Sequence, residues 1–427
     1  MASNATKALN LGLRSATLAT RFMFIFFLAK YLDPADVGYY GIFTATVGYV
    51  LYFVGLDFYT YVSREIGQAS ADRRGQLLKG QAALSALLYL AFLPIAVWLL
   101  SVTGWPDYLV WWFVPILILE HINQEVSRLL IALSEQLASS VILFLRQGSW
   151  ALVVVALMSF NASSRNLNAV MGLWMIAGIF AASAGVWKIR KLNARGWSMP
   201  VDWAWVKKGV RVSIAFLIAT LALRGVQTFD RYWLEMLGSV EVVAAYVLLL
   251  GVASTLLIFL DAGIFAFAYP ALIQHNHGGD TESSRKQVRR LLFQTLGISL
   301  AFGLGSWTAL PYFLEWIGNP IYKNALPWYP LLLSAMTINA LGMVPHYALY
   351  AKGVDRPIVL SHIFGLFGFL MSTWLLGDVF SAIAVPIGLN IAFLIILVWK
   401  AAAYFSVIKK EDTIAVFLKN NINSTPA

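Results

Sequence analysis

Apolar residues are gathered into long stretches that occupy almost the whole chain. A helix needs about 20 mostly apolar residues to cross the hydrocarbon core of a bilayer. The pattern predicts twelve such helices, near residues 12–30, 39–61, 81–101, 108–131, 139–160, 167–187, 211–230, 241–270, 291–314, 328–350, 357–376 and 381–404. The segments between them are too short to form separate domains. We therefore predict an all-α polytopic membrane protein.

The basic residues of the connecting loops indicate the orientation of these helices. Lys and Arg are enriched in the short loops that stay on the cytoplasmic side of a membrane. With both termini on that side, the outer loops hold only Arg165 and Lys323, and most remaining loop cations are cytoplasmic. We expect a multi-pass protein whose two termini are both cytoplasmic.

Composition narrows the class of protein further. The 427 residues are 59% hydrophobic and only 12% charged, and a soluble chain this apolar would aggregate. The formal net charge of +10 follows the loop pattern, so it argues for membrane topology rather than nucleic-acid binding. Cysteine is absent from the sequence, which excludes disulfides and thiolate metal sites. We expect no cofactor, no resident metal and no nucleic-acid partner.

Short matches between the two halves indicate an internal repeat. LATR at 18–21 returns as LALR at 221–224, and the LD pair at 56–57 returns at 260–261. Six helices per half keep both copies in the same orientation, related by a pseudo-two-fold axis along the membrane normal, with a central cavity for alternating access. The expected parts are an N-terminal six-helix bundle (1–187), a cytoplasmic amphipathic linker (188–210), a C-terminal six-helix bundle (211–404) and a cytoplasmic tail (405–427).

Arginines inside the apolar stretches are the main candidates for substrate binding. A charge near the bilayer centre costs at least a few kcal/mol unless it is solvated or paired. Arg14 and Arg21 are seven residues apart and share a helix face, Arg224 corresponds to Arg21 in the second half, and Arg146 lies inside the fifth helix. We predict that these four side chains line a cationic cavity. For Arg14, and for Arg231 further along, the alternative is that the side chain reaches a membrane interface.

The fourth helix is the most polar. Glu125 and Arg128 have the three-residue spacing of an intrahelical ion pair. Glu120 has no partner on its own helix, which leaves three interpretations: a proton carrier, the partner of an arginine from another helix, or a protonated acid.

Motifs of enzymes are missing from the sequence. It has no phosphate-binding glycine loop, no HExxH and no nucleophile elbow. We therefore expect a transporter that is not an enzyme, driven by an ion gradient or by the substrate's own downhill flow.

The segment 7–67, KALNLGLRSATLATRFMFIFFLAKYLDPADVGYYGIFTATVGYVLYFVGLDFYTYVSREIG, resembles the opening of the polysaccharide flippases. These proteins, often called Wzx-type, belong to the multidrug/oligosaccharidyl-lipid/polysaccharide exporter superfamily. The resemblance implies a V-shaped fold and export of undecaprenyl-diphosphate-linked oligosaccharides across the bacterial inner membrane. The products would be O-antigen, capsule or exopolysaccharide, and a polymerase and a chain-length regulator would be candidate partners. Arg21 and Arg224 would be the natural contacts for the diphosphate.

Two other functions stay open. A multidrug antiporter of the same superfamily would move organic cations against protons or sodium, and acidic residues should then dominate its cavity. A membrane glycosyltransferase or polymer ligase is disfavoured, because such enzymes usually carry a large outer loop domain.

Overall fold

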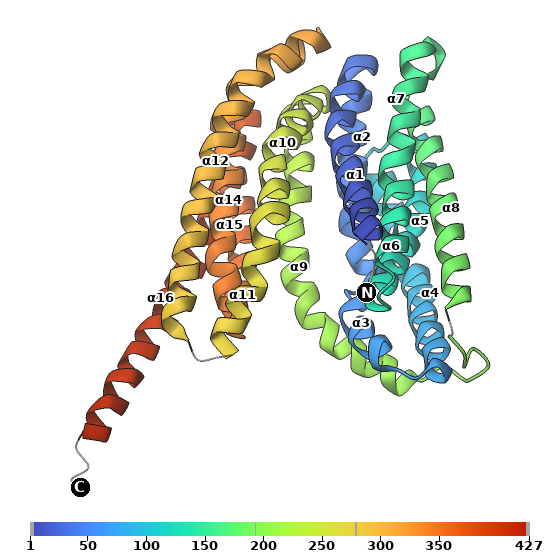
Figure 1. Cartoon of the computed structure of the whole chain (residues 1–427). Coiled ribbons are helices and arrows are strands. Elements are labelled where there is room, and N and C mark those ends of the chain that lie inside the picture. Colours follow the sequence, from blue (N-terminus) through green and yellow to red (C-terminus); the bar gives the residue numbers. More distant parts are fainter. Residues whose placement is uncertain (1–3, 193, 278–279, 424–427) are drawn as a thin grey trace. The chain divides into compact units, whose positions relative to one another are not determined.

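The computed structural model describes the backbone of residues 4–192, 194–277 and 280–423, and over these residues it contains helices and no strand (Figure 1). The α-helices are α1 (Asn4–Tyr31), α2 (Pro34–Gly55), α3 (Tyr59–Gln68), α4 (Ala71–Val102), α5 (Asp107–Ala132), α6 (Gln136–Phe144), α7 (Trp150–Phe160), α8 (Leu167–Lys191), α9 (Trp203–Leu237), α10 (Val240–Leu260), α11 (Ala266–His277), α12 (Thr281–Ile317), α13 (Pro320–Asn324), α14 (Tyr329–Ala351), α15 (Arg356–Phe380) and α16 (Ala384–Asn423). The all-α class is confirmed, and eleven of the twelve apolar stretches lie on helical segments; the stretch 39–61 is interrupted by a turn at residues 56–58, between α2 and α3.

Two of the long helices contain a single π-helical turn. The first, η1 (Leu145–Ser149), joins α6 to α7, and the second, η3 (Asp261–Phe265), joins α10 to α11. Short 3-10 turns occur at η2 (Ala162–Ser164), η4 (Leu326–Trp328) and η5 (Ser381–Ile383). π-Turns inside α-helices are rare and are frequently found at functional sites.

Length and hydropathy qualify nine helical stretches of the described chain as membrane spans, or ten when the bent α9 is added. The stretch 356–413 counts once although it contains both α15 and α16, which are separated at Ser381, where φ is 51°. The helix α5 is not among the nine, and it is the helix that carries the polar cluster between residues 120 and 128. Its polar side chains need partners inside the protein.

The chain divides into two compact units. The N-terminal unit comprises residues 1–235, 239–248 and 314–322, and the C-terminal unit comprises residues 236–238, 249–313 and 323–427. The expected second bundle began at residue 211, whereas nearly all of α9 groups with the N-terminal unit. One reason is the hydrogen bond between Thr46 and Tyr232, whose hydroxyl oxygens are 2.6 Å apart. The repeat and its symmetry axis stay predictions.

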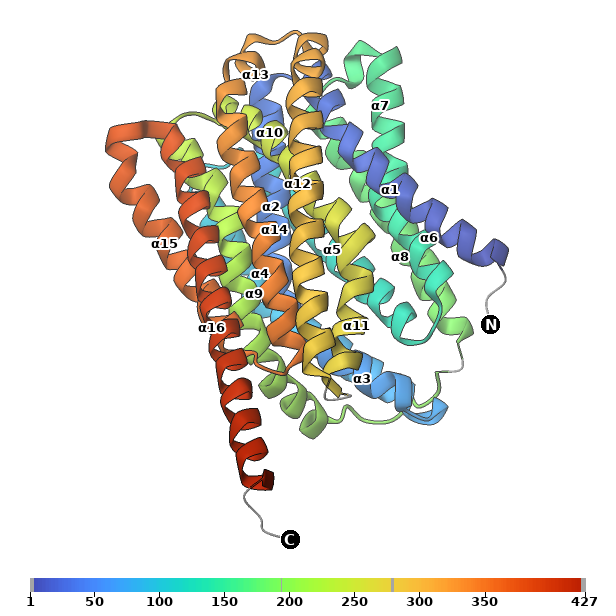
Figure 2. The same ribbon diagram turned by 60° about the vertical axis from the view of Figure 1, so that its left-hand side comes forward.

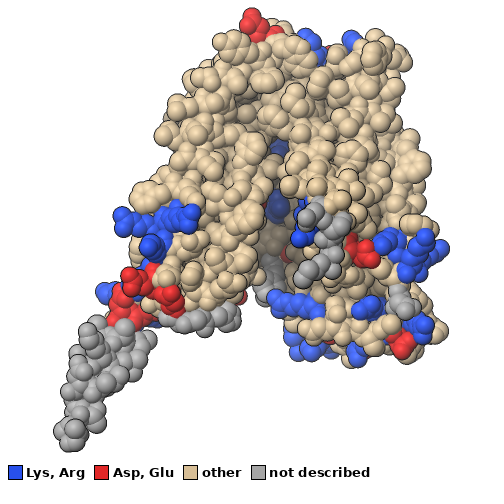
Figure 3. Space-filling model, in the orientation of Figure 1, with Lys and Arg blue, Asp and Glu red and all other residues tan. Residues whose placement is uncertain are grey.

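Backbone hydrogen bonds connect the segment before α9 to the start of α4. Arg195 N–H donates to the Ala71 carbonyl over 2.8 Å, and Gly75 N–H donates to the Arg195 carbonyl over 2.7 Å. Gly196 has φ of +86°, and a Cβ there would lie 1.9 Å from the Asp72 carbonyl oxygen, so only glycine fits. Trp205 then packs on Phe58, with ring centroids 5.4 Å apart. Figure 3 shows lysines and arginines gathered around this end of the unit, which the sequence places on the cytoplasmic side.

In the C-terminal unit, α14, α15 and α16 run side by side (Figure 2). Close approach of α15 and α16 depends on small residues, because a Cβ on Gly365 would lie 2.6 Å from the Ile396 side chain. The apolar core beside these helices includes Leu256, Phe265 and Leu349, which are almost fully buried. Small residues at the contact and buried apolar side chains therefore let these helices pack closely.

Candidate functional site

A buried ion pair connects α5 to the π-turn η1. The Nη2 and Nε atoms of Arg146 lie 2.6 and 2.7 Å from Glu120 Oε2, and Trp174 Nε1 donates to Glu120 Oε1 over 2.8 Å. Glu120 and Arg146 are only 6% and 7% exposed. Three interpretations of Glu120 were open, and the structure shows the one in which its carboxylate pairs with an arginine from another helix. The charge of Arg146 is thereby compensated inside the protein.

Aromatic packing holds this pair in place. Trp150 Nε1 donates to the Arg146 carbonyl over 2.8 Å, and the Trp150 and Trp174 rings stack at 5.5 Å with an interplanar angle of 5°. The backbone of η1 also approaches α1 closely, because a Cβ on Gly148 would lie 3.4 Å from the Thr17 Cα. The π-turn therefore brings Arg146 into the interior while its neighbours contact α1.

Two arginines of α1 form parallel hydrogen bonds to the segment that contains α6 and η1. Arg14 Nε donates to Ser140 Oγ over 2.9 Å, and Arg21 Nη1 donates to Gln147 Oε1 over 3.0 Å. Arg14 and Arg21 are seven residues apart, and so are their acceptors Ser140 and Gln147. The shared helix face expected from the sequence is therefore present. Both arginine side chains are exposed. Their hydrogen-bond partners are neutral, so the positive charges stay available to a ligand.

Arg224 of α9 is the third exposed arginine of the candidate set. Its Nη1 donates to Gln227 Oε1 over 3.1 Å, and its Cζ lies 5.7 Å from the centroid of the Tyr52 ring. Arg224 also interacts electrostatically with Asp57, which is buried at the break between α2 and α3 and hydrogen-bonded to Thr220. Arg224 thus lies in a partly acidic environment, unlike the two arginines of α1.

The remaining polar residues of α5 pair locally. Glu125 Oε1 is 2.9 Å from Arg128 Nη1, and its other oxygen accepts a hydrogen bond from Gln81 over 2.5 Å. The Arg128 guanidinium stacks over the Tyr59 ring at 3.5 Å from its centroid. Glu125 and Arg128 therefore compensate each other, which is the arrangement typical of an ion pair that supports the helix.

Sequence reasoning missed the partner of Arg231. Asp230, which is fully buried, lies 2.9 Å from Arg231 Nη1 and accepts a hydrogen bond from Tyr246 over 2.5 Å. Neighbouring positions on a helix do not ordinarily face each other, so the pattern gave no signal for this pair. Arg231 has an acidic partner within the protein, and so does not need a membrane interface.

Charges in the N-terminal unit therefore fall into two groups among the residues the structure describes. Glu120, Glu125 and Asp230 each pair with an arginine, whereas the exposed Arg14, Arg21 and Arg224 donate hydrogen bonds to neutral acceptors. Guanidinium groups bind phosphate and carboxylate with paired hydrogen bonds. These three side chains are chemically suited to bind an anionic group.

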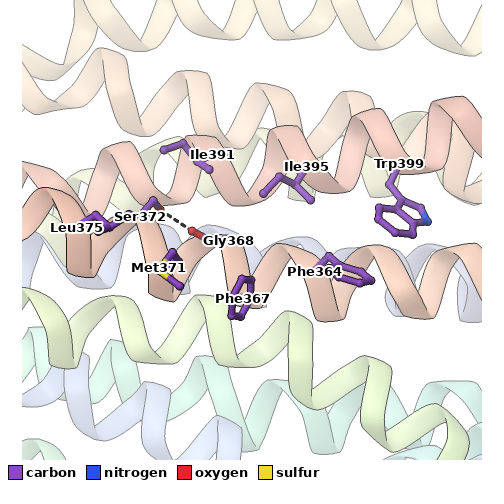
Figure 4. Close-up of a pocket in the computed structure, with 9 residues that line it drawn as sticks. All are labelled: Phe364, Phe367, Gly368, Met371, Ser372, Leu375, Ile391, Ile395 and Trp399. Atoms are coloured by element: carbon purple, nitrogen blue, oxygen red, sulfur yellow. Dashed lines mark hydrogen bonds between the residues drawn. The ribbon is translucent and has the colours of Figure 1, made fainter.

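An apolar groove lies between α15 and α16 of the C-terminal unit, lined by Phe364, Phe367, Met371, Ile391, Ile395 and Trp399 among others (Figure 4). The hydrogen bond drawn there, from Ser372 Oγ to the Gly368 carbonyl over 2.6 Å, is internal to α15. The groove presents no charged group. Within the described residues there is also no cluster of three His, Asp or Glu that could hold a metal ion.

Comparisons with known proteins agree on the fold. No family model and no curated relative matches the sequence. A solved multidrug resistance MATE family transporter of the MOP superfamily, in an inward-facing conformation, matches with a TM-score of 0.75 at 13% identity, covering 91% of this chain and 95% of that one. The chain has the MATE transporter fold.

Two further structures extend this finding. A Vibrio cholerae MATE transporter matches with a TM-score of 0.63 at 14% identity, covering 96% of this chain and 99% of that one. A MOP superfamily transporter from Pyrococcus furiosus, whose binding pocket is described as having reverse polarity, matches with a TM-score of 0.60 at 12% identity, covering 95% and 94%. At these sequence identities the likeness shows the fold alone, and it does not extend to the polysaccharide flippases named from the sequence.

Proposed function

We propose that this chain is a membrane transporter of the MOP superfamily that works by alternating access. Its support is the MATE fold over nearly the full length, together with helices that are long and apolar enough to span a bilayer. The expected location is the bacterial inner membrane, with both termini on the cytoplasmic side.

Two substrate classes remain, and each has an observation in its favour. The structural neighbours described as multidrug resistance transporters favour a multidrug extruder over a polysaccharide flippase. The charge of the N-terminal unit favours an anionic substrate, because Arg14, Arg21 and Arg224 are exposed with neutral partners while the interior carboxylates Glu120 and Glu125 are already paired. A lipophilic cation would meet repulsion on this surface.

The geometry supports an anionic amphiphile best, and we infer that it is a lipid-linked oligosaccharide carried on undecaprenyl diphosphate. The single observation behind this inference is the set of three exposed arginines that donate to neutral acceptors and form no ion pair, although Arg224 also interacts with Asp57. A diphosphate can accept several charge-assisted hydrogen bonds from such groups, each contributing about 1.5–3 kcal/mol. The neighbour with a pocket of reverse polarity is a precedent for variation of pocket charge on this fold. The multidrug extruder is the second candidate.

Competition binding to the purified protein in nanodiscs separates the two candidates. The competitors are a polyprenyl-diphosphate-linked disaccharide, the same lipid with an uncharged linkage, and a lipophilic cation. Loss of the diphosphate should weaken binding by roughly tenfold or more for each hydrogen bond lost. If the cation displaces the bound probe and removal of the diphosphate changes nothing, the multidrug function replaces the flippase.

Substitutions locate the anion contacts. Arg21→Ala and Arg224→Ala should each abolish export, and Lys at either position should keep part of it, because Lys retains the charge without the paired geometry. Arg165→Ala is the matched control. Arg165 is also exposed and its Cζ lies 4.7 Å from the Tyr31 ring centroid, but it belongs to the loop after α7. Normal surface polysaccharide in an Ala variant that is expressed at the wild-type level would exclude that residue.

A further inference from the structure

Three basic side chains meet in the interior of the C-terminal unit, one from each of the helices α14, α15 and α16. Lys400 of α16 is 2% exposed, and its Nζ lies 3.1 Å from Nε2 of His362 in α15, which is 6% exposed. The ring of His346 from α14 stacks on His362, with centroids 6.3 Å apart and an interplanar angle of 9°. None of these groups takes part in the candidate site of the N-terminal unit.

The hydrogen bond restricts how many protons this cluster can hold. A charged Lys400 can donate to the lone pair on His362 Nε2 when the imidazole is neutral, and a neutral amine can accept from an Nε2–H group. With both groups charged, two donors would face each other across 3.1 Å, and the two positive charges would repel. Lys400 and His362 together therefore carry either no positive charge or one.

The carboxylates of α16 do not neutralise Lys400. Among the side chains that the structure describes, no carboxylate forms an ion pair with Lys400. The two carboxylates further along α16 are already engaged: Glu411 lies 2.6 Å from Lys352, and Asp412 lies 2.5 Å from Arg285. A positive charge on Lys400 is therefore stabilised by its hydrogen bond to His362 and not by a carboxylate of α16.

The other titratable groups that face the cluster are mostly tyrosines. On α14, Tyr347 meets the His346 ring edge-on at 5.5 Å and Tyr350 stacks on it at 6.1 Å. Tyr347 in turn interacts with Asp261 of the π-turn η3. On α16, Tyr404 lies one turn beyond Lys400 and interacts with Arg285 and Glu411.

Helices α15 and α16 are in direct contact one turn from the pair, because a Cβ on Gly365, three residues after His362, would lie 2.6 Å from the Ile396 side chain. His346 is only partly buried, unlike the other two members of the cluster. His346 is therefore the member through which a proton from water would reach the buried pair.

We propose that Lys400 and His362, with His346 stacked on them, form the proton-binding site through which transport is coupled to the proton gradient. This proposal rests on the proposed transporter function. Binding one proton changes a neutral hydrogen-bonded pair into a cationic one in a region that is costly for charge. Helices α14, α15 and α16 each contribute one side chain, so a change in their packing changes the affinity for the proton, and proton binding favours one packing in return.

The coupling test uses the full-length protein in proteoliposomes, with a polyprenyl-diphosphate-linked disaccharide and a lipophilic cation as separate probes. For the transported probe, a gradient of one pH unit should support about tenfold accumulation per coupled proton. Lys400→Met and His362→Gln should still equilibrate the probe but lose this accumulation. Lys352→Gln is the matched control, since Lys352 belongs to the same unit and is paired with Glu411. Wild-type accumulation by the Lys400→Met protein would overturn the proposal and leave the transporter function standing.

Protonation is also measured without transport, so that failure of one proposal is distinguished from failure of the other. Histidine labelled with ¹⁵N in nanodisc samples reports the charge and tautomer of each ring. The His362 signal should report a change of charge or tautomer as the pH is varied, and this change should move in the Lys400→Met protein. A titration identical in both proteins overturns the proton site. If the titration moves but neither probe is transported by the wild-type protein, the transporter function fails instead.

Discussion

The ion pair between Glu120 and Arg146 provides the sharpest test of the N-terminal unit. Glu120→Gln keeps the shape of the side chain and removes the charge that faces a guanidinium only 7% exposed. Glu120 accepts hydrogen bonds from Arg146 and from Trp174, so the substitution disturbs both. Removal of one partner from a buried ion pair costs about 3–5 kcal/mol, mainly because the other charge is left unpaired.

This free energy translates into a large change in thermal stability. For a unit of some 250 residues, 1 kcal/mol lowers the melting temperature by about 2–4 °C, so Glu120→Gln should lower it by roughly 6–20 °C. Tryptophan fluorescence of the protein in nanodiscs is a suitable assay, because Trp150 and Trp174 stack beside the pair. The double variant Glu120→Gln/Arg146→Gln should recover much of the loss, since no charge is then left buried.

Two results would refute this reasoning. If Glu120→Gln melts within about 1 °C of the wild-type protein, the charge of Arg146 does not depend on Glu120. The second result is that Glu120→Gln removes the response of transport to a pH gradient. In that case Glu120 is the proton carrier, and the coupling assigned to Lys400 is wrong.

Two further predictions concern the helices themselves. Gly38→Val should destabilise the N-terminal unit by about 1–3 kcal/mol or more in a thermal melt, because a Cβ at this position would lie 2.0 Å from the Val240 carbonyl oxygen; Gly12→Ala, where nothing lies within 4 Å, should be neutral or slightly stabilising. The pKa of Asp280 is lowered below its usual value near 3.8, because its carboxylate accepts a hydrogen bond from Ser283 N–H at the start of α12. Because the pKa is lowered, this stabilisation is present at neutral pH and disappears as the pH falls through that pKa. Asp280→Ala should therefore accelerate amide exchange of Ser283 at pH 7 and change it little below about pH 3. Equal acceleration at both pH values would contradict the prediction.

The helices could be predicted from the sequence because their signal is local. Each apolar stretch is long enough to specify a span without knowledge of its neighbours. The parallel hydrogen bonds of Arg14 and Arg21 also follow from spacing, since residues seven apart share a helix face. The spacing within one helix equally placed Glu125 beside Arg128.

Contacts between helices could not be predicted in this way. Glu120 and Arg146 are 26 residues apart on different helices, and no periodicity of one helix identifies a partner on another. Lys400 was overlooked for a different reason: the apolar pattern ends near residue 404, so a lysine at 400 reads as the end of a span. The helix α16 in fact continues to Asn423, supported near its middle by the ion pair of Glu411 with Lys352. Lys400 is therefore an interior residue.

The π-turn at Leu145–Ser149 has a consequence for sequence change over evolution. A π-turn contains one residue more than the α-turn it replaces, so it is what a single-residue insertion leaves in a helix that keeps its ends fixed. Deletion of one residue within the turn would restore a regular α-helix, and the segments on either side would keep their faces. The residues of the turn itself, Arg146 among them, would change position. A one-residue gap at this place in an alignment would therefore mark homologues in which the approach of Arg146 to Glu120 differs.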